Sequence, residues 1–84
     1  MAYSLSFSKR AFKELEQIGE PFYSNIKQAI YGLTENPRPQ GVKKLKGRDG
    51  YRIRVGNYRV IYNIFDKQLV VDVITIGNRK DVYE

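Results

Sequence analysis

The sequence has no cysteine and no histidine among its 84 residues. Without cysteine, a disulfide framework and a thiolate metal site are excluded. Without histidine, the chain lacks the commonest metal ligand and the only side chain that titrates near neutral pH unperturbed. We therefore expect neither a metal site nor a cofactor.

Long apolar runs are also missing. No segment approaches the roughly 18 apolar residues that indicate a membrane span, and the N-terminus does not have the pattern of a secretory signal. We therefore expect a cytoplasmic protein with no membrane partner.

Positive charge, by contrast, is in excess. Fifteen lysines and arginines against nine acidic residues give a net charge of +6. An excess of this sign favours a polyanionic partner such as nucleic acid, although it says nothing about the fold. The length of 84 residues predicts a single domain, residues 1–84, with a small core.

Apolar periodicity predicts one strand and two helices in the first half of the chain. Residues 3–7 alternate as a strand, and Ser8 is a candidate N-cap for a helix that Gly19 ends. A second helix is expected to begin around Glu20 and Pro21 and to end before Pro37. Its apolar stripe is expected to belong to the core and consists of Phe22, Ile26, Ala29, Ile30 and Leu33.

Three strands are expected after a basic loop at 42–50: residues 51–55, 58–65 and 68–76. Gly56-Asn57 is typical of a two-residue type II′ hairpin loop, and Asp66-Lys67 is the expected second turn. The order β-α-α-β-β-β predicts an α+β fold. Its two N-terminal helices would pack on one face of a mostly antiparallel four-stranded sheet.

Alternation assigns the side chains of this sheet to two faces. The face toward the helices is expected to carry Tyr51, Ile53, Val55, Tyr58, Val60, Tyr62, Ile64, Leu69, Val71 and Val73. The open face is basic at one end and apolar at the other, where it carries Ile61, Val70, Ile74 and Ile76. Because little chain remains to cover this apolar end, it is either a partner surface or a set of ordinarily exposed residues.

Three arginines lie at the basic end. With a two-residue loop, Arg54 faces Arg59 directly, and Arg52 lies on the same face. Like charges placed this way destabilise a strand pair by roughly 0.2–1 kcal/mol. Residues 51–59 contain no carboxylate, which favours an anionic ligand over a merely solvated face.

The segments "YRIRVGNYRVIYNI" and "VITIGNRKDVY" resemble the RelE branch of the RelE/ParE toxin superfamily, and the similarity extends over nearly the whole chain. The resemblance implies a RelE-like fold and the toxin of a type II toxin–antitoxin pair. It further implies a metal-independent, ribosome-dependent endoribonuclease, an mRNA interferase that cuts mRNA in the ribosomal A site. The 2′-hydroxyl would attack the adjacent phosphate, and a cognate antitoxin would neutralise the toxin.

The resemblance also implies site residues. The family's basic pair falls on Arg52 and Arg54, its next arginine on Arg59, and the arginine and tyrosine of its last motif on Arg79 and Tyr83. Guanidinium groups grip phosphate oxygens and stabilise charge that develops during the reaction. A tyrosine can stack on a splayed RNA base. Two other readings stay open: Arg79 as a cap on the sheet edge and Tyr83 as a core side chain.

Two departures from the family pattern matter. Relatives often carry lysine where this chain has Arg52 and Arg54. Arginine stays protonated to about pH 12, so we interpret both as electrostatic stabilisers. The general base stays unassigned among Lys43, Lys44, Lys46, Asp49, Asp81 and Glu84.

The three lysines, together with Arg48, are expected to form a surface for ribosomal RNA. The second departure concerns the end of the chain. Several relatives continue into a further helix, whereas this sequence stops at Glu84, so we expect the apolar end of the open face to be left to the antitoxin.

Two other functions are compatible with the pattern: a ParE-like inhibitor of DNA gyrase, and a basic RNA-binding module without chemistry. The arginines and the terminal tyrosine favour the nuclease, because a gyrase inhibitor does not need a phosphate-cleaving constellation.

Overall fold

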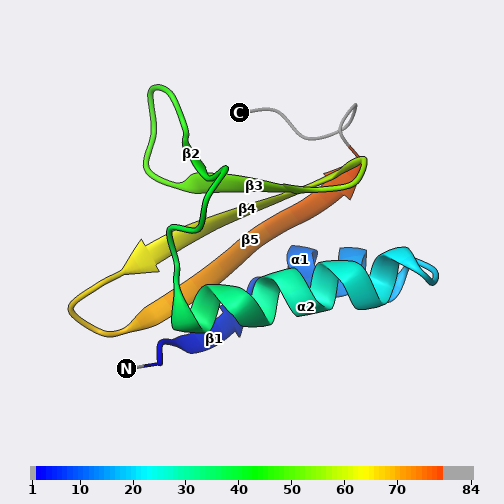
Figure 1. The fold of residues 1–84 in the computed structure, drawn as a ribbon, viewed down its shortest axis with the longest axis horizontal. Helices are drawn as coiled ribbons and strands as arrows, with labels where there is room; N and C mark the ends of the chain where they lie inside the picture. The colour runs from blue at the N-terminus through cyan, green and yellow to red at the C-terminus, as the bar shows by residue number, and fades with distance from the viewer. Residues whose placement is uncertain (1, 79–84) are drawn as a thin grey trace.

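The structure is a computed structural model and describes residues 2–78 of the chain. It is a sheet with two helices packed on one face (Figure 1). The elements are β1 (Ser4–Phe7), α1 (Lys9–Glu16), α2 (Phe22–Glu35), β2 (Lys43–Lys44), β3 (Tyr51–Val55), β4 (Tyr58–Phe65) and β5 (Val70–Asn78). The predicted α+β architecture is confirmed.

The sheet has five strands in the order β1-β5-β4-β3-β2, so the prediction of four strands was wrong. The additional strand, β2, lies in the basic loop and pairs with the start of β3, Lys43 opposite Arg52 and Lys44 opposite Tyr51. A strand of two residues has no alternation to detect. The sheet is mostly antiparallel, as predicted, and only β1 pairs in parallel, with β5.

Helix α1 begins where the sequence predicts. The hydroxyl of Ser8 accepts a hydrogen bond from the backbone N–H of Ala11 at 3.0 Å, which satisfies one of the free donors of the first turn. Helix α2 follows Pro21, which has no side-chain group to cap it. Glu20 instead accepts hydrogen bonds from the hydroxyl and the backbone N–H of Ser24, which lower the pKa of its carboxyl. Neither helix is long and apolar enough to cross a membrane, and residues 2–78 contain no other.

The main core lies between the helices and the sheet. Its fully buried side chains include Ile26 and Ile30 of α2 and Tyr62 of β4. The Tyr62 hydroxyl donates to the carbonyl of Pro37 at 2.7 Å, and burial raises the pKa of this phenol. The remaining buried members are Ala11, Leu15, Leu33, Ile53, Val60, Val71, Val73 and Ile76.

The two hairpins differ in how well the sequence predicts them. Gly56 has a φ of 61° and the loop has two residues, as expected for a type II′ turn. The β4–β5 turn spans four residues, not two, because Phe65 pairs with Val70. Leu69, predicted to be an inward strand residue, lies in this turn with a φ of 56°.

A bulge in β5 changes which residues face the core. Ile61 pairs with Thr75 and Tyr62 pairs with Val73, so Ile74 is the extra residue. Beyond the bulge the alternation of β5 is shifted by one. The predicted position of Ile76 on the open face was therefore wrong, since this side chain is 1% exposed in the core on the helix side.

The open face has a small core of its own. Leu45, from the loop after β2, is 4% exposed and packs with the fully buried Ile61, while Ile74 lies partly buried beside them. The expectation that no part of the chain covers Ile61 was thus wrong. Gly50 closes this loop with a φ of 130°, and a Cβ there would lie 3.0 Å from Leu45 Cδ1, so the loop requires glycine.

Candidate cationic site on the open face

Two cross-strand rows of basic residues meet on the face of the sheet opposite the helices. In the first row Arg54 of β3 lies opposite Arg59 of β4, as predicted. In the second row Lys43 of β2 lies opposite Arg52 of β3. Residues two apart on a strand share a face, so Arg52 and Arg54 join the two rows. We call these four residues the cationic site.

The four side chains are exposed to different degrees. Lys43 and Arg54 are exposed and Arg59 is half-buried, whereas Arg52 is only 4% exposed. The open face is therefore not uniformly solvated. A ligand on the surface would meet Lys43, Arg54 and Arg59, with the charge of Arg52 beneath it.

A groove of about 330 Å³ lies beside this site. Its lining comes from β3, from β2 and from the two residues Gln40 and Gly41. The lining residues are Gln40, Gly41, Lys43, Arg52, Ile53 and Arg54. None of these lining residues, all within the described chain, is acidic, so the groove is electrostatically suited to an anion.

The arrangement opposes stability. Each like-charged cross-strand pair costs roughly 0.2–1 kcal/mol, and the site contains two such pairs, Lys43–Arg52 and Arg54–Arg59. A bound phosphate would offset this repulsion, because guanidinium groups bind phosphate oxygens through a fork of N–H donors.

The predicted RNA-binding cluster is divided by β2. Lys43 lines the groove. Lys44 instead lies opposite Tyr51, and its ammonium is 5.5 Å from the centre of the Tyr51 ring. Lys44 lines a separate hollow of about 320 Å³ that also contains Asp49. Lys46 and Arg48 are exposed on the loop beyond.

An ion pair between Arg38 and Asp66 lines the hollow beside Lys44. Arg38 donates to both carboxylate oxygens of Asp66, at 2.9 and 3.2 Å, and Tyr3 donates to the same carboxylate at 2.7 Å. The hydrogen bonds from Arg38, followed by that from Tyr3, lower the pKa of Asp66. Asp66 is consequently a poor proton acceptor.

These positions reduce the candidates for a general base. Among Lys43, Lys44, Lys46 and Asp49, only Lys43 lines the groove of the cationic site. Its proximity to Arg52 was missed in the sequence, because the pairing depends on β2. Arg79, Asp81, Tyr83 and Glu84 lie outside the described residues.

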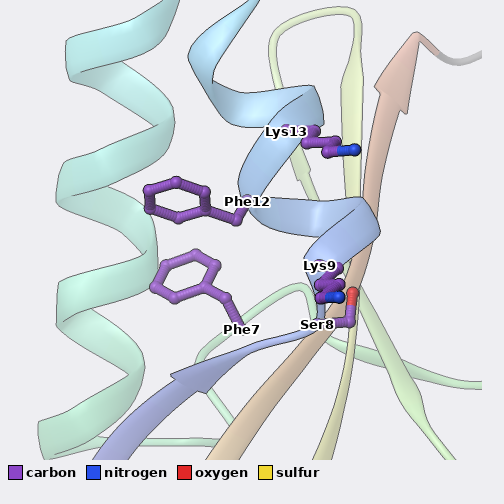
Figure 2. Close-up of a pocket in the computed structure, with 5 residues that line it drawn as sticks. All are labelled: Phe7, Ser8, Lys9, Phe12 and Lys13. Atoms are coloured by element: carbon purple, nitrogen blue, oxygen red, sulfur yellow. The ribbon is translucent and has the colours of Figure 1, made fainter.

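A third hollow lies on the helix side of the molecule, with a volume of about 380 Å³. Figure 2 shows the rings of Phe7 and Phe12 pointing toward α2, with Lys9, Lys13 and Ser8 on the other side of α1. Phe12 is 54% exposed. This hollow does not contain the facing arginines of the cationic site.

Comparison with known proteins places the chain in a family. Residues 5–83 match the family model of the ParE toxin of the type II toxin–antitoxin system, parDE. The chain is 36% identical over 83 residues to the mRNA interferase toxin RelE of Escherichia coli, which covers 95% of this chain and 86% of that protein.

Solved structures agree. The archaeal RelE–RelB complex from Pyrococcus horikoshii has a TM-score of 0.84 at 30% identity and covers 98% of this chain and 100% of that one. The intact E. coli RelBE toxin–antitoxin complex has a TM-score of 0.80 at 36% identity and covers 92% and 96%. The chain belongs to the RelE branch of the RelE/ParE superfamily of toxins from type II toxin–antitoxin systems.

Proposed function

We propose that this protein is an mRNA interferase, the toxin of a type II toxin–antitoxin pair, which cuts mRNA in the ribosomal A site and so inhibits translation. The E. coli relative at 36% identity carries the name mRNA interferase toxin RelE. The observation that carries the proposal here is the convergence of Lys43, Arg52, Arg54 and Arg59 on one face of the sheet.

The proposed reaction needs such a site. The 2′-oxygen of one nucleotide attacks the adjacent phosphorus, a P–O2′ bond forms and the P–O5′ bond breaks. The products are a 2′,3′-cyclic phosphate and a 5′-hydroxyl. Negative charge increases on the phosphoryl oxygens in the transition state, and preorganised cations stabilise that charge more than they stabilise the ground state.

We assign the surface contacts to Arg54, Arg59 and Lys43, because these are the members with exposed or half-buried side chains. Arg52, at 4% exposure, contributes its positive charge from beneath the phosphate. Arg79 and Tyr83 are proposed to complete the site, Arg79 at the phosphate and Tyr83 by stacking on a base.

The small number of candidate bases in the described part of the site supports dependence on the ribosome. A positioned general base contributes about 10²–10⁴-fold, and Lys43 is the only candidate base that lines the groove in the described chain. The remaining rate enhancement must come from charge stabilisation and from substrate orientation, which a ribosome-held mRNA supplies. We expect little cleavage of a free oligonucleotide.

A cognate antitoxin is the proposed protein partner. Two related structures are toxin–antitoxin complexes, one archaeal and one from E. coli. Of the predicted partner surface, Ile61 and Ile76 are buried, so Val70 and Ile74, both half-buried, are the members left for such a contact.

The test is to map mRNA 5′ ends in a purified translation system. The wild-type protein should produce new cuts at A-site codons. Arg54→Ala and Arg79→Ala should abolish them, whereas Lys67→Ala, a matched loss of one exposed charge in the β4–β5 turn, should not. If folded wild-type protein makes no cuts, the proposal fails, and a DNA supercoiling assay would test the gyrase-inhibitor alternative.

The loop lysines have a separate test. Simultaneous replacement of Lys43, Lys44 and Lys46 by alanine should weaken ribosome binding and reduce its dependence on salt, since fewer counterions are released. Unchanged salt dependence would show that these side chains do not contact ribosomal RNA.

A further inference from the structure

The outer edge of β5 is held by two different elements. β1 pairs in parallel with the first residues of β5, up to the pair Phe7–Val73. Immediately beyond this pair the chain turns into α1, and the backbone N–H of Ser8 donates to the carbonyl of Val73 at 2.9 Å. From that point α1 takes over from β1 along the edge of the strand.

Side chains of α1 make the next contacts. The hydroxyl of Ser8, which points toward β5 in Figure 2, donates to the carbonyl of Ile74, the bulged residue, at 2.6 Å. Glu14 then accepts two hydrogen bonds on Oε1, from the backbone N–H of Ile76 at 2.9 Å and from the hydroxyl of Thr75 at 2.8 Å. A helix carboxylate thus occupies the place that a neighbouring strand would have taken.

The contacts cover the stretch in which the register of β5 shifts. Tyr62 pairs with Val73, and the extra residue at Ile74 places Gly77 opposite Arg59. Without that residue the same count along the strand would place Ile76 opposite Arg59, with its side chain on the open face. A shift of one residue exchanges the two faces of a strand. The bulge therefore leaves a glycine, rather than an isoleucine, beside an arginine of the cationic site.

We propose that Glu14 is a positioning residue for the cationic site: its carboxylate holds the bulged end of β5 in the register that places Gly77 beside Arg59. This inference rests on the proposed function and adds to it a residue on the helix side of the molecule.

Glu14 has a second contact, which supplies a control. Its other carboxylate oxygen, Oε2, lies 3.5 Å from the guanidinium of Arg10, one helical turn earlier. The Arg10 side chain is 71% exposed, and exposed pairs of this kind contribute little. Arg10→Ala therefore provides a matched control, because it alters the surroundings of the carboxylate without touching β5.

The experiment compares the wild-type protein with Glu14→Ala, Glu14→Gln and Arg10→Ala in two assays. One is amide hydrogen exchange at Ile76. The other is single-turnover mRNA cleavage on programmed ribosomes, which gives the rate at saturation and the half-saturating concentration.

We expect Ile76 exchange at least tenfold faster in Glu14→Ala. The saturated rate should fall at least tenfold while the half-saturating concentration changes less than threefold. Glutamine retains an oxygen acceptor, so Glu14→Gln should restore both values to within threefold, and Arg10→Ala should behave as wild type.

The proposal is overturned if Glu14→Ala exposes the Ile76 amide but cleaves at the wild-type rate, or if Glu14→Gln is as impaired as Glu14→Ala. If Glu14→Ala does not fold, Thr75→Val is the second variant, because it removes one hydrogen-bond donor and keeps the side-chain shape. Its saturated cleavage rate should fall by a smaller factor, while its half-saturating concentration stays nearly unchanged. A wild-type rate in that variant overturns the proposal. Absence of cleavage by the wild type would instead reject the proposed function, and Ile76 exchange alone would then decide whether Glu14 holds the strand.

Discussion

Removal of one arginine from the cationic site should stabilise the fold while it abolishes function. Arg54 lies directly opposite Arg59 and is exposed. Two unit charges roughly 6 Å apart in water repel by about 0.7 kcal/mol, within the range of roughly 0.2–1 kcal/mol for like charges on facing strand positions. Arg54→Gln removes this repulsion and keeps most of the side-chain length.

We therefore expect Arg54→Gln to raise the free energy of unfolding by about 0.2–0.7 kcal/mol at low salt. For a domain of this size, this corresponds to a rise of about 1–5 °C in Tm. In 1 M NaCl, where the Debye length is about 3 Å, the gain should nearly vanish. Urea and thermal denaturation at both salt concentrations measure it.

Lys67→Gln is the control, since it removes the same formal charge from the β4–β5 turn. An equal gain in Lys67→Gln would attribute the effect to net charge alone. A loss of stability in Arg54→Gln at low salt would refute the idea that the facing arginines repel. A gain in stability together with lost cleavage would show that Arg54 lowers the stability of the fold and is needed for activity, the trade-off expected at a functional site.

Three further perturbations test the packing. Tyr62→Phe leaves the Pro37 carbonyl without its hydrogen bond and should cost about 1–3 kcal/mol in urea at pH 7. Burial raises the pKa of the Tyr62 phenol in the folded state. The stability that the protonated phenol contributes is therefore complete below the unfolded-state pKa of about 10 and decreases as the pH rises above it. The difference in unfolding free energy between wild type and Tyr62→Phe should consequently become smaller toward pH 11. Leu69→Asn relieves a φ of 56° and should raise the free energy of unfolding by up to about 1 kcal/mol, measured as a higher urea midpoint. A lower midpoint would contradict strain there. Leu45→Ala uncovers the buried Ile61 and should cost about 2 kcal/mol and increase binding of a hydrophobic dye, and an unchanged midpoint would mean that this small cluster adds no stability.

Local rules were enough for the parts of the fold in which neighbours in sequence determine the geometry. The Ser8 cap depends on residues three apart, and the Gly56 turn fixes the pairing of Arg54 with Arg59. Together with the alternation of the strands, these features predict the α+β class and three of the four residues of the cationic site, Arg52, Arg54 and Arg59.

Tertiary contacts determined what the sequence did not predict. The pairing of Lys43 with Arg52 depends on a two-residue strand, and the burial of Ile61 depends on Leu45, reached through a loop. The inward position of Ile76 depends on the bulge in β5. A side chain of α1 contacts the strand there, since Glu14 accepts a hydrogen bond from the Ile76 backbone N–H. Alternation alone cannot show such a change of phase, because the sequence carries no mark of the extra residue.

The order of the strands in the sheet affects how the chain can fold during its synthesis. β5 lies between β1 and β4 in the sheet. β1 therefore has no strand to pair with until β5 has been synthesised. Synthesis proceeds from the N-terminus, and pairings this distant in sequence form late. While the nascent chain still lacks residues 70–78, Arg59 has no β5 residue opposite it. The core then also lacks the buried side chains of Val71, Val73 and Ile76. The sheet is therefore complete only after residues 70–78 have been synthesised, because β5 is the strand that joins β1 to β4.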